Sequence, residues 1–499
     1  MVRRDIVANF LGRSWAMLMG IAFVPVYLAI LGPEAYGLIG FYATLQAVLI
    51  IADFGLSWTI TRELSRAPAS GAGKHQLASL LRTLEIAYWL IAILAGAAVS
   101  IIGGALSERW FRSNTLSTDE IRQTLQLMGV VLALQMPSLF YQGALNGFDR
   151  QPTTNLIASL SAMLRWGGAA LVVWLVSPTV HAFFAWQVVA AAVGTGITAW
   201  AAWRNVAGEF RRASFDPRVL RQVWRFTFGI LASAVAGVLA MQVDKLVLSR
   251  LVTLEQFGYY SLAVLLASLV PALVTPFHTA FFPRFSQAHA QGDWPTVSRL
   301  YHSGSQLLSM LIVPTALVLV FFPHELLLVW TGTEAAARNA GTLLSLLALG
   351  NLLYSLAGFP NLMLFAAGLP MISATVLIVL AACILPSLLV FAPRFGPIAA
   401  AIIWVVASAA YLLAIVPATH RRLLGGELLR WCTSSVLVPV AVASAVFAVA
   451  HWLMPADGAM PVQLFFVACA WTIATLCVAI ALPEIRQRLA AVPMRSRGA

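Results

Sequence analysis

The sequence is a succession of apolar stretches, each about 20 residues or longer, separated by short polar breaks. A stretch of this length can cross the hydrocarbon core of a bilayer as an α-helix. Inside a bilayer, backbone polar groups must be satisfied within helices or closed barrels. Only 10% of the 499 residues are charged, whereas a typical soluble domain contains roughly 25%. The sequence therefore predicts an all-α integral membrane protein.

The charged and turn-rich breaks delimit about fourteen expected transmembrane helices. The first six are expected at about 6–31, 35–58, 79–106, 123–146, 153–177 and 181–203. The next six are expected at about 226–250, 256–282, 300–322, 341–367, 370–391 and 397–417. Two more follow at about 433–453 and 462–482.

Lys and Arg residues are distributed unevenly between the two sides of the membrane. With the N-terminus in the cytoplasm, the outer segments contain only Arg109, Arg112, Arg122, Arg250, Arg338 and Arg394. Most other Lys and Arg residues fall in the inner segments, including an Arg-rich stretch at 204–225. Because cytoplasmic loops are enriched in Lys and Arg, we expect both termini in the cytoplasm. The net charge of +12 is explained better by membrane topology and by attraction to anionic lipid headgroups than by binding to nucleic acid.

The chain aligns weakly with itself at an offset of 221 residues. GPEAYGLIGFYATL (32–45) lies over TLEQFGYYSLAVLL (253–266), which pairs Glu34 with Glu255 and Gly37 with Gly258. An even number of spans separates the copies, so we expect two halves of one topology around a central cavity, related by an axis along the membrane normal. The expected parts are a six-helix lobe at 1–205, a cytoplasmic linker at 206–225, a second six-helix lobe at 226–420, two additional helices at 421–482 and a basic cytoplasmic tail at 483–499.

Several stretches resemble a known family of transporters. VDKLVLSRLVTLEQFGYYSLA (243–263), followed by AFFPRFSQ (280–287), resembles the start of the second half of Wzx-type polysaccharide flippases. ILGPEAYGLIGFYATLQAVLIIADFGL (30–56) resembles their first loop and second span, and YQGALNGFDRQ (141–151) resembles the turn after their fourth span. These motifs are shared across the multidrug/oligosaccharidyl-lipid/polysaccharide exporter superfamily, which also includes multidrug exporters and lipid II flippases.

The resemblance implies two six-helix lobes around a V-shaped cavity. It also implies a substrate, an undecaprenyl-pyrophosphate-linked oligosaccharide, which such proteins move to the outer leaflet of the bacterial inner membrane for surface polysaccharide synthesis. The implied partners are this lipid-linked oligosaccharide and the membrane lipids, with a polysaccharide polymerase and a chain-length regulator as candidate protein partners. A multidrug exporter or a lipid II flippase of the same fold remains an alternative.

A protein that carries a pyrophosphate through the membrane needs positively charged side chains at membrane depth. The negative charge of the headgroup must be balanced there by positive charge, because the dielectric constant is low. Arg165 lies about midway along the fifth span, too far from either surface to reach the headgroups easily. We expect it to line the cavity; the alternative is an Arg satisfied by helix carbonyls or a neighbouring polar group. Arg13, with Asn9 one turn before it, is a second candidate, whose alternative is a side chain that reaches the cytoplasmic surface.

Five further charged candidates and one amide complete the expected site. Asp244 and Lys245, with Gln242 nearby, form a polar group in the outer third of the seventh span, which we expect to face the cavity. The alternative is a Lys that reaches the outer headgroups while the Asp caps a local group. Adjacent positions of a helix point about 100° apart, so we expect no simple face-to-face pair there. Arg82 and Glu85 are spaced for a local ion pair near the membrane surface, although a place in the cavity is the alternative. Asp53 and Glu85 are candidates for ion coupling; for Asp53 the alternative is an ion pair with an Arg such as Arg13.

No motif in the sequence supports catalysis. Neither the P-loop pattern GxxxxGK[ST] nor HExxH occurs, and the eight histidines are scattered. We therefore expect a transporter and not an enzyme, with no cofactor and no metal. A membrane polymerase or ligase for the same sugars would be expected to have large outer loops, whereas these loops are at most about 20 residues long. A cation-coupled multidrug exporter would require acidic residues in the cavity, where this chain places more Arg and Lys.

Overall fold

The computed structural model describes residues 15, 18–70, 73–206, 208–210, 213–217, 241–454 and 460–486, with the backbone alone at 67–70 and 106. Two of the candidate site residues, Asn9 and Arg13, lie outside the described residues. So do the beginning of the first expected span and most of the seventh. The chain divides into two compact units, residues 1–258 and 259–499.

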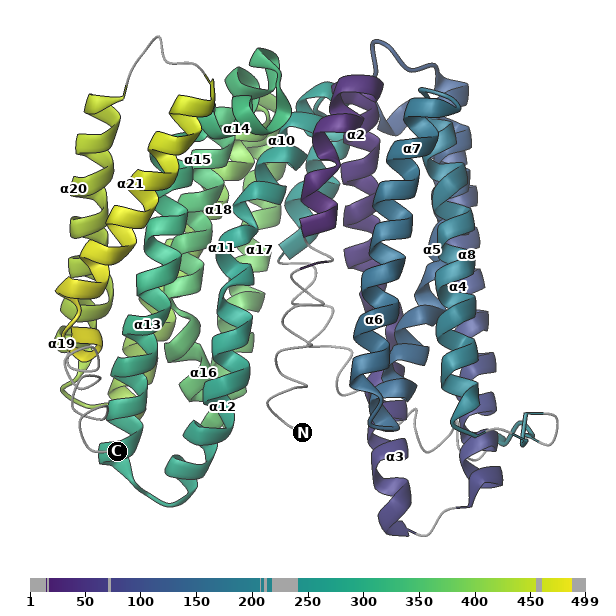
Figure 1. Cartoon of the computed structure of the whole chain (residues 1–499), viewed down its shortest axis with the longest axis horizontal. Helices are drawn as coiled ribbons and strands as arrows, with labels where there is room; N and C mark the ends of the chain where they lie inside the picture. Colours follow the sequence, from purple (N-terminus) through teal and green to yellow (C-terminus); the bar gives the residue numbers. More distant parts are fainter. Residues whose placement is uncertain are drawn as a thin grey trace. The chain divides into compact units, whose positions relative to one another are not determined.

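The first unit consists of long helices joined by short turns (Figure 1). Its elements are α2 (Val24–Leu49), η1 (Ile50–Asp53), α3 (Leu56–Ser70), α4 (Lys74–Trp110), α5 (Thr118–Gly147), α6 (Gln151–Ala162), η2 (Met163–Gly167), α7 (Gly168–Leu175) and α8 (Val180–Arg204). Residues 241–251 are also helical. Helix α5 packs along α3, α4 and α8, and the buried rings of Tyr88, Phe140 and Tyr141 fill the space between them.

A break at Gly32 divides α2 into the end of the first expected span and the beginning of the second. The backbone of Gly32 adopts φ 80° and ψ 173°, a conformation that favours glycine. Pro33 follows, and a proline is well tolerated at the beginning of a helix because it lacks a backbone N–H. The break lies where the sequence predicts a turn, between residues 31 and 35.

The crossing of α4 and α5 is formed by small residues. A Cβ atom on Gly96 would lie 2.4 Å from the carbonyl oxygen of Gly129, and a Cβ atom on Gly129 would lie 2.4 Å from that of Gly96. The hydroxyl of Ser100, one turn beyond Gly96, donates a 2.9 Å hydrogen bond to the carbonyl oxygen of Gln126. Lipid tails are as apolar as helix side chains, so the hydrophobic effect does not drive helices together within the bilayer. Close packing of backbones at small residues, together with hydrogen bonds between helices, drives their association instead.

Two glycines that the predicted repeat pairs, Gly37 and Gly258, lie against each other within the first unit. A Cβ atom on Gly37 would lie 2.4 Å from the carbonyl oxygen of Leu254, and one on Gly258 would lie 2.2 Å from that of Pro33. Leu254 and Pro33 are themselves 221 residues apart, so the contact is reciprocal. The contact follows the offset found in the sequence; a repeat over the whole chain stays a prediction.

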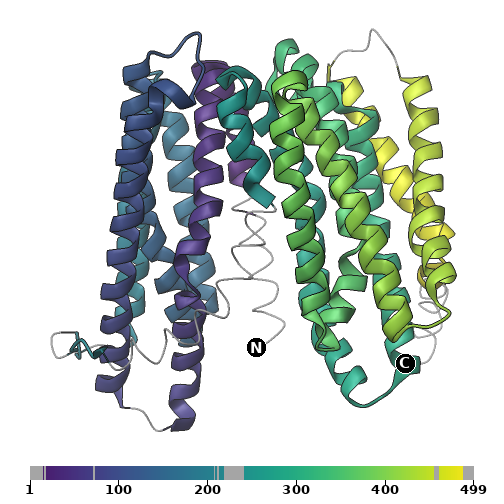
Figure 2. The same ribbon diagram turned by 180° about the vertical axis from the view of Figure 1, so that it is seen from behind.

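The second unit is also helical. Its elements are α10 (Leu254–Ala267), which begins in the first unit, α11 (Leu269–Ala272), α12 (Val274–Ala290), α13 (Trp294–Phe321), α14 (Pro323–Thr331), α15 (Glu334–Leu356), α16 (Gly358–Ala366), α17 (Pro370–Phe395), α18 (Pro397–Leu423), α19 (Leu428–Trp431), η3 (Cys432–Leu437), α20 (Val438–Leu453) and α21 (Met460–Ala481). Helix α18 packs along α15 and α17. The last two helices, α20 and α21, lie side by side (yellow in Figure 2) and both contact α13.

Within the described ranges, twelve helical stretches are long and apolar enough to cross a membrane. They correspond to the second to sixth and the eighth to fourteenth expected spans. The all-α class is therefore confirmed, and the protein is a multi-pass membrane protein. The total of fourteen stays a prediction, because part of the first expected span and most of the seventh fall outside the described residues. The stretch Leu254–Ala290 continues past the expected end at 282.

Candidate functional site

Arg165 lies in a π-helical turn in the middle of a membrane span. The turn, η2, joins α6 and α7 into the span Gln151–Leu175. Three consecutive carbonyl oxygens of the turn accept side-chain hydrogen bonds: that of Leu164 from Trp186 Nε1 at 2.9 Å, that of Arg165 from Gln187 Nε2 at 3.3 Å and that of Trp166 from the Tyr27 hydroxyl. A π-helical turn disturbs the regular backbone pairing, and neighbouring helices supply the missing partners.

The guanidinium of Arg165 contacts two uncharged polar side chains. Its Nε donates a 3.1 Å hydrogen bond to Oε1 of Gln187 on α8, and its Nη2 lies 3.5 Å from the hydroxyl of Tyr42 on α2. Gln187 and Tyr42 are both buried, whereas Arg165 is half-buried. The guanidinium carbon also lies 5.6 Å from the ring centre of the neighbouring Trp166. The side chain is thus held in a defined position by α2 and α8.

A second layer of polar groups holds Tyr42. Its hydroxyl donates a 2.8 Å hydrogen bond to Oε1 of Gln135 on α5 and accepts a 3.0 Å hydrogen bond from Nε2 of Gln46. The same amide nitrogen of Gln46 also lies 2.7 Å from Oε1 of Gln135. A polar network at membrane depth is stable only when its groups are paired. This network connects α2, α5, α6–α7 and α8.

Among the described residues, no carboxylate pairs with Arg165. An Arg side chain remains protonated in a protein and has five N–H groups, of which the two contacts above use two. The positive charge is therefore positioned but not neutralised by a described acid. A charge at bilayer depth is expensive, which makes Arg165 a candidate for a functional site. The arrangement can bind an anion with several oxygens, such as a phosphate, through the remaining N–H groups.

Lys245 and Asp244 form an ion pair, although no simple face-to-face pair was expected from adjacent helix positions. Lys245 Nζ lies 3.1 and 3.2 Å from the two carboxylate oxygens of Asp244 and donates a 2.9 Å hydrogen bond to the carbonyl oxygen of Met241. The long, flexible Lys side chain folds back along its own helix, which the angle between adjacent positions does not take into account. The pair is electrically neutral, unlike Arg165. Gln242 is half-buried on the same helix.

Arg82 and Glu85 form a local ion pair with a distance of 2.9 Å between Nη1 and Oε2. The other oxygen of Glu85 accepts hydrogen bonds from the Tyr141 hydroxyl at 2.5 Å and from Trp203 Nε1 at 3.0 Å. The Arg82 guanidinium also lies 4.2 Å from the ring centre of Phe210, beyond the end of α8. The carboxylate therefore connects α4, α5 and α8 at one end of the first unit.

Replacing Glu85 with Ala should destabilise the protein by about 3 kcal/mol. The change leaves a half-buried guanidinium and two hydrogen-bond donors without their acceptor. The matched control is Glu63→Ala, which breaks an ion pair with Arg62 whose side chains are 38% and 35% exposed, and should cost at most about 1 kcal/mol. Thermal unfolding of the purified variants in detergent measures both effects. Equal unfolding temperatures for the two variants would contradict the structural role of Glu85.

Asp53 is buried at the irregular end of the second span. Its Oδ1 accepts a 2.8 Å hydrogen bond from the hydroxyl of Tyr88 and further bonds from the hydroxyl and backbone N–H of Ser57. Phe54 follows in a left-handed conformation, with φ 49°, which ends η1. No cation pairs with Asp53 in the part of the chain that the structure describes. The expected alternative partner, Arg13, lies outside that part.

The uncharged members of these clusters were not predicted from the sequence. Gln46, Gln135 and Gln187 each interrupt an apolar span, and an amide at membrane depth is a signal of the same kind as a charge. They were not predicted, because the candidates were charged residues and the amides next to them, Asn9 and Gln242. Tyr42 could not have been identified, because tyrosines are common in membrane helices and the network around it joins residues far apart in the sequence.

Solved structures with a similar fold are transporters. The lipid II flippase MurJ in an inward closed conformation is 13% identical, with a TM-score of 0.72 over 94% of this chain and 97% of that chain. A multidrug resistance MATE family transporter of the MOP superfamily in an inward-facing conformation is 14% identical, with a TM-score of 0.67 over 83% of this chain and 96% of that chain. At these identities the likeness shows the fold alone.

Two family models each match more than half of the sequence. The model described as "Polysaccharide biosynthesis protein" matches residues 2–289, and the model described as "Lipid II flippase MurJ" matches residues 167–468. The chain belongs to the polysaccharide biosynthesis protein family of the multidrug/oligosaccharidyl-lipid/polysaccharide exporter superfamily. A similar curated protein, from Shigella flexneri and described as "Putative O-antigen transporter", is 20% identical over 404 residues, which are 80% of this chain and 93% of that protein.

Proposed function

We propose that this protein moves an undecaprenyl-pyrophosphate-linked oligosaccharide from the cytoplasmic to the periplasmic leaflet by alternating access with a cationic cavity. The observation that carries the proposal is the positioned guanidinium of Arg165, which has no carboxylate partner among the described residues and lies in the middle of a span. Membership of the polysaccharide biosynthesis protein family supports a sugar-bearing substrate.

The chemistry of the Arg165 cluster suits the pyrophosphate of such a lipid. A guanidinium donates parallel hydrogen bonds to phosphate oxygens and keeps its charge in a low dielectric. The amides of Gln46, Gln135 and Gln187 belong to the same cluster and are uncharged, so they suit sugar hydroxyls. A cationic drug would be repelled from Arg165, which makes a multidrug exporter the less favoured alternative.

The proposed setting is the bacterial inner membrane, with both termini in the cytoplasm. We also propose two lobes, at 1–205 and 226–420, with two further helices at 421–482. This division is based on the apolar spans and the 221-residue offset in the sequence. A polysaccharide polymerase and a chain-length regulator are the proposed protein partners, because they would act on the unit that reaches the outer leaflet.

Asp53 is the proposed proton carrier for coupling, since it is a buried acid with hydroxyl partners and no described cation. Asp53→Asn should remove the dependence of transport on an imposed proton gradient, because the amide cannot bind and release the proton. Glu85→Gln is the comparison, since Glu85 is already paired with Arg82 and should leave the gradient dependence in place. Transport by proteoliposomes, with and without the gradient, measures both. Gradient dependence that persists in Asp53→Asn would contradict this role.

The experiment that tests the transport function uses a strain lacking this gene. Accumulation of undecaprenyl-linked oligosaccharide together with loss of surface polysaccharide is the expected result. Unchanged polysaccharide with new sensitivity to cationic drugs would instead favour the multidrug exporter. Arrest of cell wall synthesis with accumulated lipid II would favour a lipid II flippase, a candidate that the second family match supports.

A further inference from the structure

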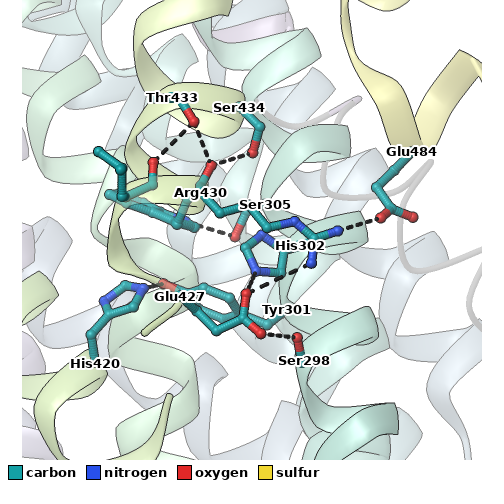
Figure 3. A network of polar contacts seen from close by, with 12 residues as sticks. Ser298, Tyr301, His302, Ser305, His420, Glu427, Arg430, Thr433, Ser434 and Glu484 are labelled. Carbon is teal, nitrogen blue, oxygen red and sulfur yellow. Dashed lines mark hydrogen bonds and ion pairs between the residues drawn. The ribbon is translucent and has the colours of Figure 1, made fainter. Parts of the chain in front are cut away.

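A polar network holds the C-terminal helices of the second unit to α13 (Figure 3). The Ser309 hydroxyl donates a 2.6 Å hydrogen bond to the carbonyl oxygen of Ser435 in the π-helical turn η3, and Trp431 Nε1 donates a 3.1 Å bond to Ser305. Nearer the start of α13, His302 and Ser298 contact Glu427, which precedes α19, at 2.8 and 2.9 Å. These residues of α13 follow one another at helical spacing and so lie on one face.

His302 is the ionisable group of this face, and its ring is fully buried. Its Nε2 lies 2.8 Å from Oε2 of Glu427. An ionised carboxylate only accepts hydrogen bonds, so Nε2 carries the proton of the neutral ring and Nδ1 is left with a lone pair. Nδ1 is buried and has no hydrogen-bond partner among the described residues. His302 therefore has a free basic nitrogen inside a helix interface.

The charges around His302 are already paired with one another. Arg430 Nη1 lies 3.7 Å from Oε2 of Glu427, and its Nη2 lies 3.4 Å from Oε1 of Glu484, beyond α21. Burial raises the pKa of Glu427, but the hydrogen bonds from His302 and Ser298 outweigh it and, with Arg430, hold that pKa below its ordinary value. The titratable and charged groups on the elements packed around His302 are Tyr301 on its own helix, His420 on α18, Glu427 and Arg430 at α19, Cys432 in η3 and Glu484 after α21.

We propose that His302 is a proton-binding site, and that binding of a proton to its Nδ1 releases the α19–η3 segment and the end of α21 from α13. The proton adds to the lone pair of Nδ1, and the ring becomes an imidazolium. This inference concerns the C-terminal helices and goes beyond the transport function proposed above.

Burial and pairing set the direction of this effect. An imidazolium would place a new N–H donor at a buried atom without an acceptor, which is costly. Glu427 favours the charged ring, but Arg430 and Ser298 already share its charge. In the undocked state, water can solvate the imidazolium. The docked state thus binds the proton less tightly than the undocked state, so docking is strong above the ordinary pKa of histidine, about 6.5, and is lost as the pH falls.

The first test compares His302→Gln with the matched control His181→Gln, which changes an exposed histidine on α8. Thermal unfolding of the full-length protein in nanodiscs is followed between about pH 7.5 and 5.5, a range that brackets the ordinary histidine pKa. The wild type and His181→Gln should lose stability as the pH falls, whereas His302→Gln should lose most of that dependence. A pH dependence in His302→Gln equal to that of the wild type would overturn the proposal.

A second measurement uses the wild type alone, so it stands even if His302→Gln does not fold. Hydrogen–deuterium exchange, corrected for the intrinsic effect of pH, is compared at the two ends of the same range. The segment 428–437 should exchange at least several-fold faster at the lower pH, while α8 of the first unit should not change. Equal protection of 428–437 at both pH values would show that proton binding does not release these helices.

Discussion

Arg165→Ala is expected to abolish transport of the lipid-linked oligosaccharide while the protein remains folded in the membrane. The guanidinium is the proposed partner of the substrate pyrophosphate, and truncating one member of a desolvated charge pair costs about 2–5 kcal/mol. A loss of this size lowers affinity by about 30-fold to several thousand-fold. Folding should be retained, because Gln187 and Tyr42 hold the guanidinium as neutral partners and no described carboxylate loses its counter-charge.

Transport of undecaprenyl-linked oligosaccharide into the outer leaflet of proteoliposomes, together with surface polymer in cells, measures this loss. Arg165→Lys should retain part of the activity, since an ammonium keeps the charge but not the planar set of donors. Arg122→Ala is the matched control, because Arg122 is exposed and pairs with Asp119 on the surface. Normal transport by a well-expressed Arg165→Ala variant would disprove the role of Arg165.

Gly129→Leu should prevent the stable packing of α4 on α5. A Cβ atom at this position would lie 2.1 Å from the hydroxyl oxygen of Ser100 and 2.4 Å from the carbonyl oxygen of Gly96. The backbone of α4 cannot yield as a flexible side chain would, so the two helices must separate. Overpacking of a well-packed core typically costs about 1–3 kcal/mol, and a clash with backbone belongs at the upper end or above.

The matched control for this variant is Gly196→Leu on α8. Nothing lies within 4 Å of a Cβ atom at Gly196, and this position is exposed. Both substitutions replace glycine with the same good helix former, so intrinsic helix propensity favours both variants equally. Yield of monodisperse protein in detergent and the unfolding temperature should fall for Gly129→Leu alone. Similar behaviour of the two variants would show that the α4–α5 crossing tolerates a side chain.

The sequence was sufficient to place most of the helices. Apolar stretches bounded by charged residues coincide with twelve helical spans, because hydrophobic length is a local property that the bilayer selects directly. The turn at Gly32 was also predictable, since a Gly-Pro pair between two apolar stretches is typical of a turn. The ends of helices were less predictable where they extend past the apolar part, as at Ala290.

The candidate site was predicted only in part. Arg165 could be selected from the sequence, because a charge in the middle of a span is expensive wherever the helix lies. The pairing of Asp244 with Lys245 was not predicted, since a flexible side chain decides it and not the helical angle. Glu85 appeared as a partner of Arg82 by spacing, but its bonds to Tyr141 and Trp203 join three helices and have no local signal.

The sequence alone therefore determined the membrane-spanning class of this protein, most of its spans and the depth of its buried charges, because each depends on residues close together in the chain. Only the tertiary structure decided which charges are neutralised. Arg165 is left with Gln187 and Tyr42, whereas Glu85 is saturated by its neighbours. That difference arises from side chains that helix packing brings together from distant positions. Because no described carboxylate balances the charge of Arg165, this residue is the proposed position for an anionic substrate.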